Sequence, residues 1–254
     1  MRDGLETTPI DPSHSAAVRR LGAGRVLSNE EIAFFEAAQN DRAEYAAGDD
    51  IVRDDDLLRH AVIIRKGWAM RWHATAGGTR QIINVYVPGE IYGLHINFYR
   101  HAMHNLTALT EVELARIGPE QILDIYRTYP ILAAGLDWSS ARSVNVLSER
   151  NISLGARRAS SRILHLLLEI YLRLMAVGET EADGFAMPLT QQQLADICGL
   201  SIVHTNRTLR ALVRAKLIAL SRARVTFPDF DAAMAACEFD GRFLAPLKLR
   251  MRPG

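Results

Sequence analysis

Residues 187–220, MPLTQQQLADICGLSIVHTNRTLRALVRAKLIAL, constrain the fold more than any other stretch of this chain. Thr190 stands where a first helix would begin, and Gln193 follows three residues later, which is the spacing of a capping box. Gly199 stands where that helix must end, because glycine adopts the left-handed C-cap conformation without a steric penalty. The pattern predicts two short helices joined by a tight turn.

The second helix of this pair has two chemically different sides. Ser201 can cap its first turn. Thr205, Leu209 and Leu212 recur at helical spacing and are expected to face inward. The opposite side carries Val203, Asn206, Arg207 and Arg210. We therefore expect one side to pack against the first helix and the other to face a ligand.

The charge of this region is one-sided. Between Ile197 and Pro228 the chain has no Asp or Glu but has six basic residues, which are Arg207, Arg210, Arg214, Lys216, Arg222 and Arg224. A helical hairpin with a solvated basic face is the simpler alternative. The caps, the turn glycine, the inward side and the lack of acids all agree, however, and together they predict double-stranded DNA as the partner.

The segment LTQQQLADICGLSIVHTNRTLRALVRAKLI resembles the C-terminal winged helix-turn-helix of the Crp/Fnr superfamily of bacterial transcription regulators. The resemblance is strongest to the branch whose recognition helix has the pattern Ser-x-Val-His-x-Asn-Arg-Thr-Leu. It implies that Arg207 reads a guanine and that Asn206 also contacts the site. Val203 stands where many members carry a base-reading Glu, so the operator is expected to differ from theirs.

Further DNA contacts are expected around this helix. His204 is a candidate for a base or phosphate contact, and four residues are better placed for the DNA backbone, namely Thr190, Ser201, Arg210 and Arg222. The resemblance also implies a homodimer on an inverted repeat whose half-sites lie about 34 Å apart. RNA polymerase is a further expected partner if the protein activates transcription.

The first half of the chain has a different pattern. Residues 43–117 form short runs rich in Val, Ile, Thr and aromatic residues, and Gly77-Gly78 marks a candidate hairpin turn. The resemblance extends to this half through Pro-Gly-Glu-Ile-Tyr-Gly at 88–93. It implies an α+β fold with an N-terminal β-roll (double-stranded jelly-roll) sensor domain, a long dimerisation helix and a C-terminal winged helix-turn-helix.

Five segments follow from these patterns. They are a loose N-terminal arm (1–27), the β-roll sensor domain (28–130), the dimerisation helix (131–155), the winged helix-turn-helix domain (156–240) and a basic tail (241–254). A rough heptad in the third segment predicts the dimer contacts, which are Leu136, Ser140, Ser143, Leu147, Arg150 and Leu154. This seam is polar, and a solvated helix is the alternative interpretation.

The sensor half lacks one element of a cyclic-nucleotide site. Family members that bind cyclic nucleotides hold the phosphate with an Arg followed by small hydroxyl or alanine residues. This chain keeps Gly89 and Glu90 but has no such unit in the following IYGLHINFYRHAMHNLTAL. We therefore expect neither cAMP nor cGMP, and we name Gly89, Glu90, His101 and His104 as candidates for the pocket of an unknown effector.

Two alternatives to a DNA-binding regulator of this kind were weighed. A haem- or metal-binding gas or redox sensor with the same DNA output would use His95, His101 and His104, but their spacing matches no zinc signature. A cupin-like metalloenzyme would need a His-x-His pair and a carboxylate in the barrel, and the pair is missing. We predict no cofactor, no metal site and no enzymatic activity.

Composition and cysteine content agree with a soluble regulator. The net charge is only +1, but residues 28–60 contain ten acids and three basic residues, so an acidic body accompanies the basic reader. Cys198 occupies an apolar helix position and is expected to be an inert buried thiol, and neither it nor Cys237 indicates a disulfide framework. No signal peptide and no apolar run long enough to span a membrane is evident, so a cytoplasmic location is expected.

Overall fold

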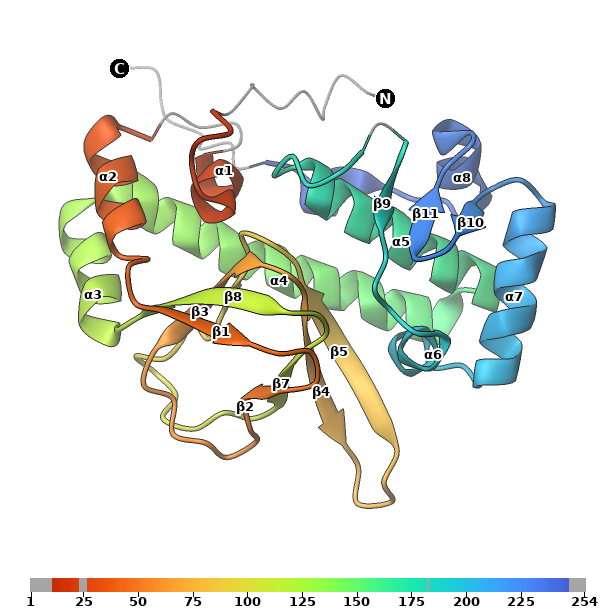
Figure 1. The fold of residues 1–254 in the computed structure, drawn as a ribbon, viewed down its shortest axis with the longest axis horizontal. Coiled ribbons are helices and arrows are strands. Elements are labelled where there is room, and N and C mark those ends of the chain that lie inside the picture. The colour runs from red at the N-terminus through yellow and green to blue at the C-terminus, as the bar shows by residue number, and fades with distance from the viewer. Residues whose placement is uncertain (1–10, 23–26, 182, 247–254) are drawn as a thin grey trace.

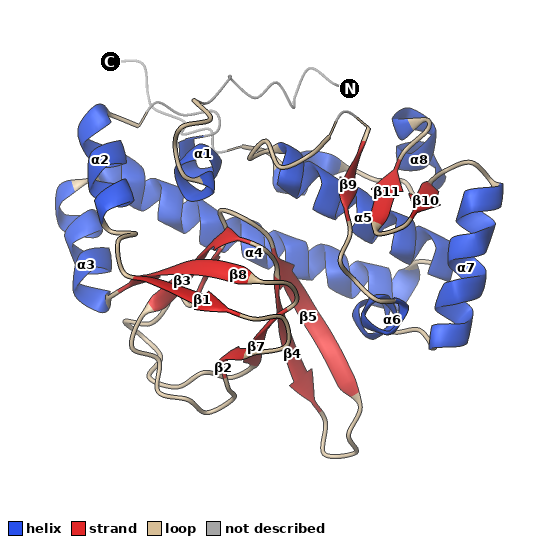
Figure 2. Cartoon of the chain, viewed as in Figure 1, coloured by secondary structure: helices blue, strands red, loops and turns tan. Residues whose placement is uncertain are grey.

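The computed structural model describes residues 11–22, 27–181 and 183–246. The long helix α4 (Pro130–Ala156) runs through the molecule, with a strand-rich part against its first half and a helix-rich part toward its end (Figure 1). Most strands gather in the first part, whereas the second has only a small sheet among its helices (Figure 2). The predicted α+β class is confirmed.

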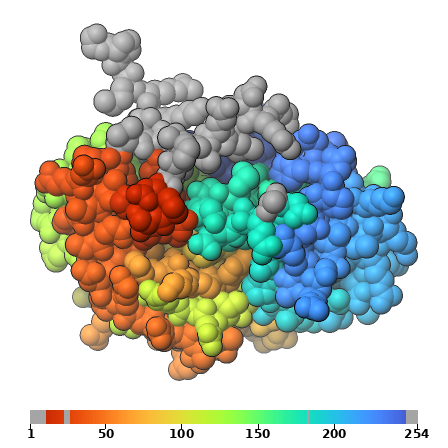
Figure 3. All heavy atoms as spheres, turned by 45° about the horizontal axis from the view of Figure 1, so that its top comes forward, coloured from red at the N-terminus to blue at the C-terminus, as the bar shows by residue number. Residues whose placement is uncertain are grey.

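The N-terminal segment is not the loose arm that the sequence predicted. Residues 16–22 form α1 (Ala16–Gly22), whose Leu21 packs against Gly135 of α4 and is 1% exposed. In the space-filling view α1 lies directly against the segment that follows α5, where Arg19 Nη2 approaches Glu179 Oε1 at 3.3 Å (Figure 3). The error arose because seven residues show too little periodicity, although their apolar side chains are covered by distant parts of the chain. Residues 1–10 and 23–26 lie outside the described residues.

The second helix begins where the sequence predicted. Ser28 caps α2 (Asn29–Ala37): its Oγ accepts a hydrogen bond from the Glu31 amide at 3.1 Å, and the Glu31 carboxylate accepts one from the Ser28 amide at 2.8 Å. This is the expected capping box. α2 and α3 (Pro119–Thr128) lie beside α1 at one end of the molecule (Figure 1).

Eight strands form the β-roll as two four-stranded antiparallel sheets. The strand orders are β1-β8-β3-β6 and β2-β7-β4-β5. The bounds are β1 Arg42–Tyr45, β2 Asp50–Val52, β3 Ala61–Lys66, β4 Ala69–Ala74, β5 Arg80–Tyr86, β6 Ile91–Tyr92, β7 Asn105–Ala108 and β8 Val112–Ile117. Alternate side chains of both sheets are buried between them, as expected for a jelly-roll core.

The β4–β5 hairpin is the longest strand pair of the roll and projects from it (Figure 1). It pairs from Ala69 opposite Tyr86 to Ala74 opposite Arg80, with one register shift between Arg71 and Trp72. Gly78 in the turn has φ +80°, a conformation that favours glycine. The hairpin predicted around Gly77-Gly78 is therefore present.

Helix α4 corresponds to the predicted dimerisation helix, but two of its six predicted contact residues face their own chain. Leu136 is 2% exposed within the core formed with α1 and the β-roll. Arg150 is 8% exposed and pairs with Glu169 of α5 (Ala159–Met175) at 3.2 Å. The heptad was misjudged because this helix packs against its own chain along much of its length, so an apolar position does not indicate which neighbour covers it.

The C-terminal part wraps three short helices and a sheet around α5. Its elements are β9 (Gly184–Ala186), α6 (Gln191–Cys198), α7 (Ile202–Arg214), β10 (Ala219–Ser221), β11 (Arg224–Thr226), α8 (Phe230–Ala236) and the 3-10 helix η2 (Gly241–Leu244). The sheet order is β10-β11-β9. The sequence predicted a two-stranded wing and missed β9, because its partner strand lies beyond the helix pair and local patterns do not report such pairing.

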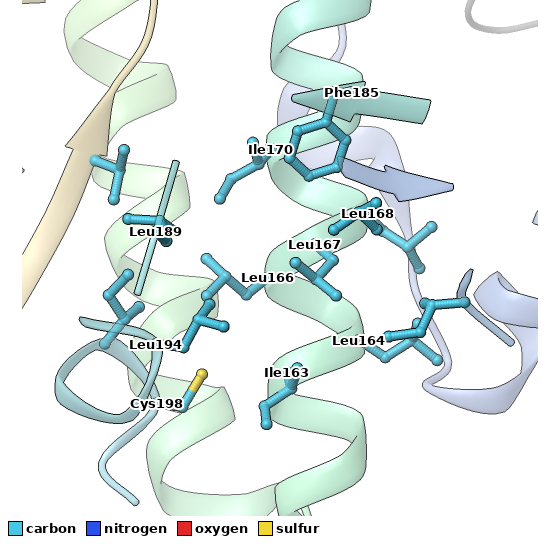
Figure 4. Close-up of a cluster of buried hydrophobic side chains, with 14 of the residues drawn as sticks. Ile163, Leu164, Leu166, Leu167, Leu168, Ile170, Phe185, Leu189, Leu194 and Cys198 are labelled. Carbon is cyan, nitrogen blue, oxygen red and sulfur yellow. The ribbon is translucent and has the colours of Figure 1, made fainter. Parts of the chain in front are cut away.

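The side chains of α5 form the centre of this part. Ile163, Leu167, Leu168 and Ile170 are fully buried and point toward the surrounding helices and the wing, where Phe185 of β9 covers them (Figure 4). Burial of this many aliphatic side chains stabilises each by about 1.5–3 kcal/mol relative to exposure. α5 thus fixes the positions of α6 and α7.

The chain after α8 differs from the solvated basic tail that was expected for 241–254. Leu244 of η2 is 8% exposed, and Trp138 of α4 donates its indole N–H to the Ala245 carbonyl at 3.3 Å. Part of the tail therefore packs on α4. Residues 247–254 lie outside the described residues.

Candidate nucleic-acid interface

Helices α6 and α7 form the pair that the sequence predicted. Thr190 Oγ1 accepts from the Gln193 amide at 3.2 Å and Gln193 Oε1 accepts from the Thr190 amide at 2.8 Å, which completes the capping box. Gly199 has φ +61° at the C-cap of α6. Ser201 Oγ accepts from the His204 amide at 3.2 Å and begins α7. Local sequence chemistry thus sets both the ends of the helices and the turn.

The two sides of α7 separate as expected. Thr205, Leu209 and Leu212 are at most 4% exposed, and Thr208 is also buried, with its hydroxyl donating to the His204 carbonyl at 2.8 Å. The opposite side is open to solvent: Val203 is 76% exposed, and Arg207 and Arg210 are exposed as well. A buried side that fits α5 and α6 therefore presents the other side outward.

The outward side forms a shallow hollow that continues toward the wing. Its floor is made by Val203, Asn206, Arg207, Arg210 and Arg214, and a second hollow beside it reaches Gln191 and Leu220. No carboxylate lines either hollow. Arg222 lies exposed at the turn between β10 and β11 with φ +54°. Basic side chains from α7 and the wing thus border one concave surface.

Five of the six basic residues have no ion-pair partner among the residues that the structure describes, and these are Arg207, Arg210, Arg214, Lys216 and Arg222. Arg224 differs, since its guanidinium pairs with Glu181 and, at 3.1 Å, with Asp183. Its charge is neutralised within the chain, so it contributes little to attraction of an anion. The unpaired five are available to phosphates.

The sequence did not identify Gln191. Its Oε1 accepts a hydrogen bond from the Asn206 side-chain amide at 2.9 Å, which joins the first turn of α6 to the exposed side of α7. This contact orients Asn206 and leaves its carbonyl oxygen as an acceptor. The signal was absent because a contact between residues fifteen positions apart depends on the angle between the two helices.

The four residues proposed for an effector pocket take part in separate contacts. A Cβ at Gly89 would lie 2.4 Å from the Ala16 carbonyl, so α1 packs directly on this turn. Glu90 is 7% exposed and engaged by arginines from α1, α4 and α5. His101 bonds the Asp55 carbonyl at 3.0 Å, while the His104 ring lies edge-on to that of His73.

Burial and nearby cations lower the pKa of His104, as Arg71 and His73 lie close to it. Within the described ranges no group of three or more His, Cys, Asp or Glu side chains is arranged to hold a metal ion. Cys198 and Cys237 are both free and buried, and burial raises the pKa of Cys198 to about 11. None of the helices in the described part has the length and apolar character to cross a bilayer.

Two family models match this chain. Residues 42–129 match the cyclic nucleotide-binding domain, which here is the β-roll with α3, and residues 161–232 match the Crp-like helix-turn-helix domain, which contains α6, α7 and the wing. The two matches fall on the two structural parts described above and leave α4 between them.

Curated relatives are transcription regulators. The chain is 22% identical to the nitrogen fixation regulation protein FixK of Bradyrhizobium diazoefficiens, covering 84% of this chain and 88% of the relative. It is 25% identical to the transcriptional activator protein FnrL of Cereibacter sphaeroides, with 85% and 86% covered, and 27% identical to the transcriptional activatory protein AadR of Rhodopseudomonas palustris, with 87% and 92% covered.

Solved structures share the arrangement of both parts. FixK2 from Bradyrhizobium japonicum superposes with a TM-score of 0.69 at 17% identity, covering 76% of this chain and 95% of that one. The regulator TTHB099 of Thermus thermophilus gives 0.61 at 16% identity, with 78% and 97% covered. With a cyclic nucleotide-binding domain, a Crp-like helix-turn-helix and relatives of this kind, the chain belongs to the Crp/Fnr superfamily and is a DNA-binding transcription regulator.

Proposed function

We propose that the protein acts as a homodimer that binds an inverted-repeat operator, with α7 of each copy in a major groove. The observation that carries this proposal is the exposed side of α7, where Arg207 and Arg210 have no carboxylate partner among the described residues. A helix of this diameter fits the major groove, which is about 12 Å wide.

The proposed roles divide the surface into base readers and backbone contacts. Arg207 donates both ends of its guanidinium to guanine O6 and N7, and Asn206 or His204 adds a second contact. Arg210 and Arg222 neutralise phosphates. The hydroxyls of Thr190 and Ser201 accept the capping amides, so each still has its O–H to donate to a phosphate oxygen.

A different stripe of α4 from the predicted one supports dimer formation. Val144 and Ile152 are 60% and 48% exposed, and they lie on one side of the helix with exposed Ala141 and Ser148. The spacing of three and four residues is that of a helix-pairing seam. This stripe is displaced by one position from the predicted heptad, and small residues in it allow a second copy of α4 to approach closely.

We propose further that the effector is not a cyclic nucleotide. The absence of an Arg-Ser/Thr-Ala unit after Glu90 supports this, as does the engagement of the Glu90 carboxylate by the chain's own arginines. Isothermal titration of the protein with cAMP and cGMP tests this point, and heat release that saturates at one ligand per protomer would refute it.

Selection of bound fragments from random duplexes tests the proposal for DNA. The expected result is an inverted repeat with half-sites one helical turn apart and a guanine at a fixed place in each half. A recovered motif without two-fold symmetry, or no enrichment at low ionic strength, would contradict it. Repetition with Arg207→Ala shows whether the guanine depends on this side chain.

A further inference from the structure

Six ionisable side chains are buried together where the β-roll meets α1, α4 and α5. They are Arg20, Arg142, Arg150, Arg173, Glu90 and Glu169, each at most 8% exposed. Four guanidinium groups thus face two carboxylates, and the excess among the described residues is two positive charges. Buried charges need partners, because the interior solvates them poorly.

The carboxylates are shared in a chain of ion pairs. Glu169 lies between Arg150, at 3.2 Å, and Arg173, at 2.8 Å. Glu90 accepts from Arg173 Nε at 2.9 Å and from Arg142 Nη1 at 3.2 Å. Both carboxylates are therefore fully used by cations from the sensor and DNA-binding parts.

Several guanidinium nitrogens in this cluster remain without a hydrogen-bond partner. These are Nε of Arg142, Nε of Arg150, and Nε and Nη1 of Arg20. Burial lowers the pKa of Arg20 to about 9 and also lowers that of Arg142, with neighbouring arginines adding to the effect in both. The cluster therefore has donors and charge that its own acceptors do not match.

A small cavity adjoins the cluster. Arg142, Arg173 and Asn84 line it, together with Ser139, Ser143 and Val146 of α4. Its volume of about 10 Å³ holds one particle of the size of a water molecule. Asn84 accepts from Arg173 through its carbonyl oxygen, which leaves its amide group as a donor toward other acceptors.

We propose that this cavity binds one small inorganic anion, with chloride as the probe, held by the Arg142 guanidinium and by hydroxyl and amide donors of Ser139 and Asn84. The anion halves the excess positive charge of the cluster. Glu90 also borders the cavity, but three arginines already neutralise it. Because the donors come from β5 and α4 and the paired arginines from α1 and α5, anion binding stabilises the junction between sensor and DNA-binding parts.

Thermal unfolding at constant sodium concentration and ionic strength tests this proposal, with gluconate replaced stepwise by chloride. Gluconate is too large for the cavity. We expect chloride to raise Tm by about 2–4 °C, the shift for one weakly bound ligand on a chain of this size. Chloride-35 NMR should show line broadening by the protein that bromide reverses by competition.

Two variants separate the cavity from general salt effects. Arg142→Gln removes the anion's main partner, and Val146→Ile fills the cavity while keeping every charge; both should abolish the chloride-specific rise. The matched control is Arg53→Gln, whose exposed guanidinium pairs only with Asp50 and which should keep the rise. If Arg142→Gln fails to fold, Val146→Ile and the NMR competition still decide.

Three outcomes would overturn the proposal. One is an equal Tm in chloride and gluconate for the unmodified protein, which would mean that the cavity holds water only. The second is a chloride-specific rise that survives in Val146→Ile. The third is chloride line broadening that bromide does not reverse.

Discussion

Arg80 at the start of β5 holds Asp196 of α6: its Nε and Nη2 atoms both lie 2.7 Å from Asp196 Oδ2. Gln81 adds a hydrogen bond from its side-chain amide to the Asp196 carbonyl at 2.6 Å. The β4–β5 hairpin of the sensor part therefore contacts the first helix of the DNA-binding pair. A change in the β-roll has a direct physical route to α6 through this contact.

Arg80→Gln should loosen α6 without unfolding the protein. The pair is partly exposed, so we expect a loss of unfolding free energy of about 1 kcal/mol or less. The clearer result is faster hydrogen–deuterium exchange of amides in 194–199, since α6 loses an anchor from the hairpin. Arg53→Gln, which breaks the exposed pair with Asp50, is the control and should leave that exchange unchanged. Unchanged exchange in Arg80→Gln would show that α5 alone positions α6.

Arg207→Ala and Arg210→Ala should weaken DNA binding in different ways. Loss of a bidentate guanine contact costs about 1–3 kcal/mol and relaxes discrimination at that base, because the mutant no longer distinguishes O6 and N7 from other base edges. Loss of a phosphate contact weakens all sequences alike and reduces the slope of log affinity against log salt by about one. Affinities measured over several salt concentrations on operators with single base changes test this, and identical behaviour of the two variants would refute the division of roles.

Val144→Glu should dissociate the dimer. The side chain is 60% exposed in the single chain, so the substitution costs the fold of one protomer little. In a two-fold interface the change places two carboxylates close together and away from water, which costs about 3 kcal/mol or more and weakens association by at least about 100-fold. Sedimentation equilibrium measures this. Leu57→Glu, at a β-roll position that is 51% exposed, is the control, and an unchanged dimer in Val144→Glu would exclude this stripe as the interface.

The sequence predicted the recognition helices accurately because their signals are local. Thr190, Gly199 and Ser201 each act within a few residues, through a cap or a left-handed backbone, and the inward side of α7 follows from helical periodicity alone. The same reasoning located the β4–β5 hairpin at Gly77-Gly78. Contacts between neighbours in sequence leave a pattern that can be recognised.

Contacts between distant elements left no such pattern. The partners of Glu90 lie on three helices, and the sequence interpreted it as a possible ligand of an effector, although it is a structural carboxylate within an arginine cluster. Leu136 and Arg150 matched a heptad, but α1 and α5 cover them. Periodicity identifies a helix face that is covered and does not identify what covers it.

Both cysteines should be unreactive in the folded protein. Burial raises the pKa of Cys198 to about 11 and that of Cys237 to about 12, so little thiolate forms at pH 8, and both sulfur atoms are shielded from reagents. Titration with a disulfide reagent should detect no fast-reacting thiol in the native protein and two after denaturation. A fast native phase that disappears in Cys198→Ser would instead indicate an accessible, redox-competent thiol.

Glu90 should make stability depend on acid in a defined window. Coulombic attraction and hydrogen bonding by Arg173, with Arg20 and Arg142, outweigh desolvation and lower the pKa of Glu90 from 4.5 to about 2. A carboxylate whose pKa is lower in the folded state binds fewer protons there, so its stabilising contribution is complete above pH 4.5 and is lost as pH falls toward about 2. The size of this contribution is roughly 3 kcal/mol.

Glu90→Gln tests this contribution, because it removes the titrating group and keeps the shape. At pH 7 we expect a loss of about 3–5 kcal/mol of unfolding free energy, since three buried guanidinium groups lose their shared partner. Between pH 4.5 and the lowest pH at which both proteins still fold, the free energy of the unmodified protein should fall more steeply than that of the variant. Urea unfolding at a series of pH values measures both slopes, and Glu44→Gln, at an exposed or half-exposed strand position, is the matched control. Parallel pH curves for Glu90→Gln and the unmodified protein would mean that the arginine cluster does not depend on this carboxylate for its stability.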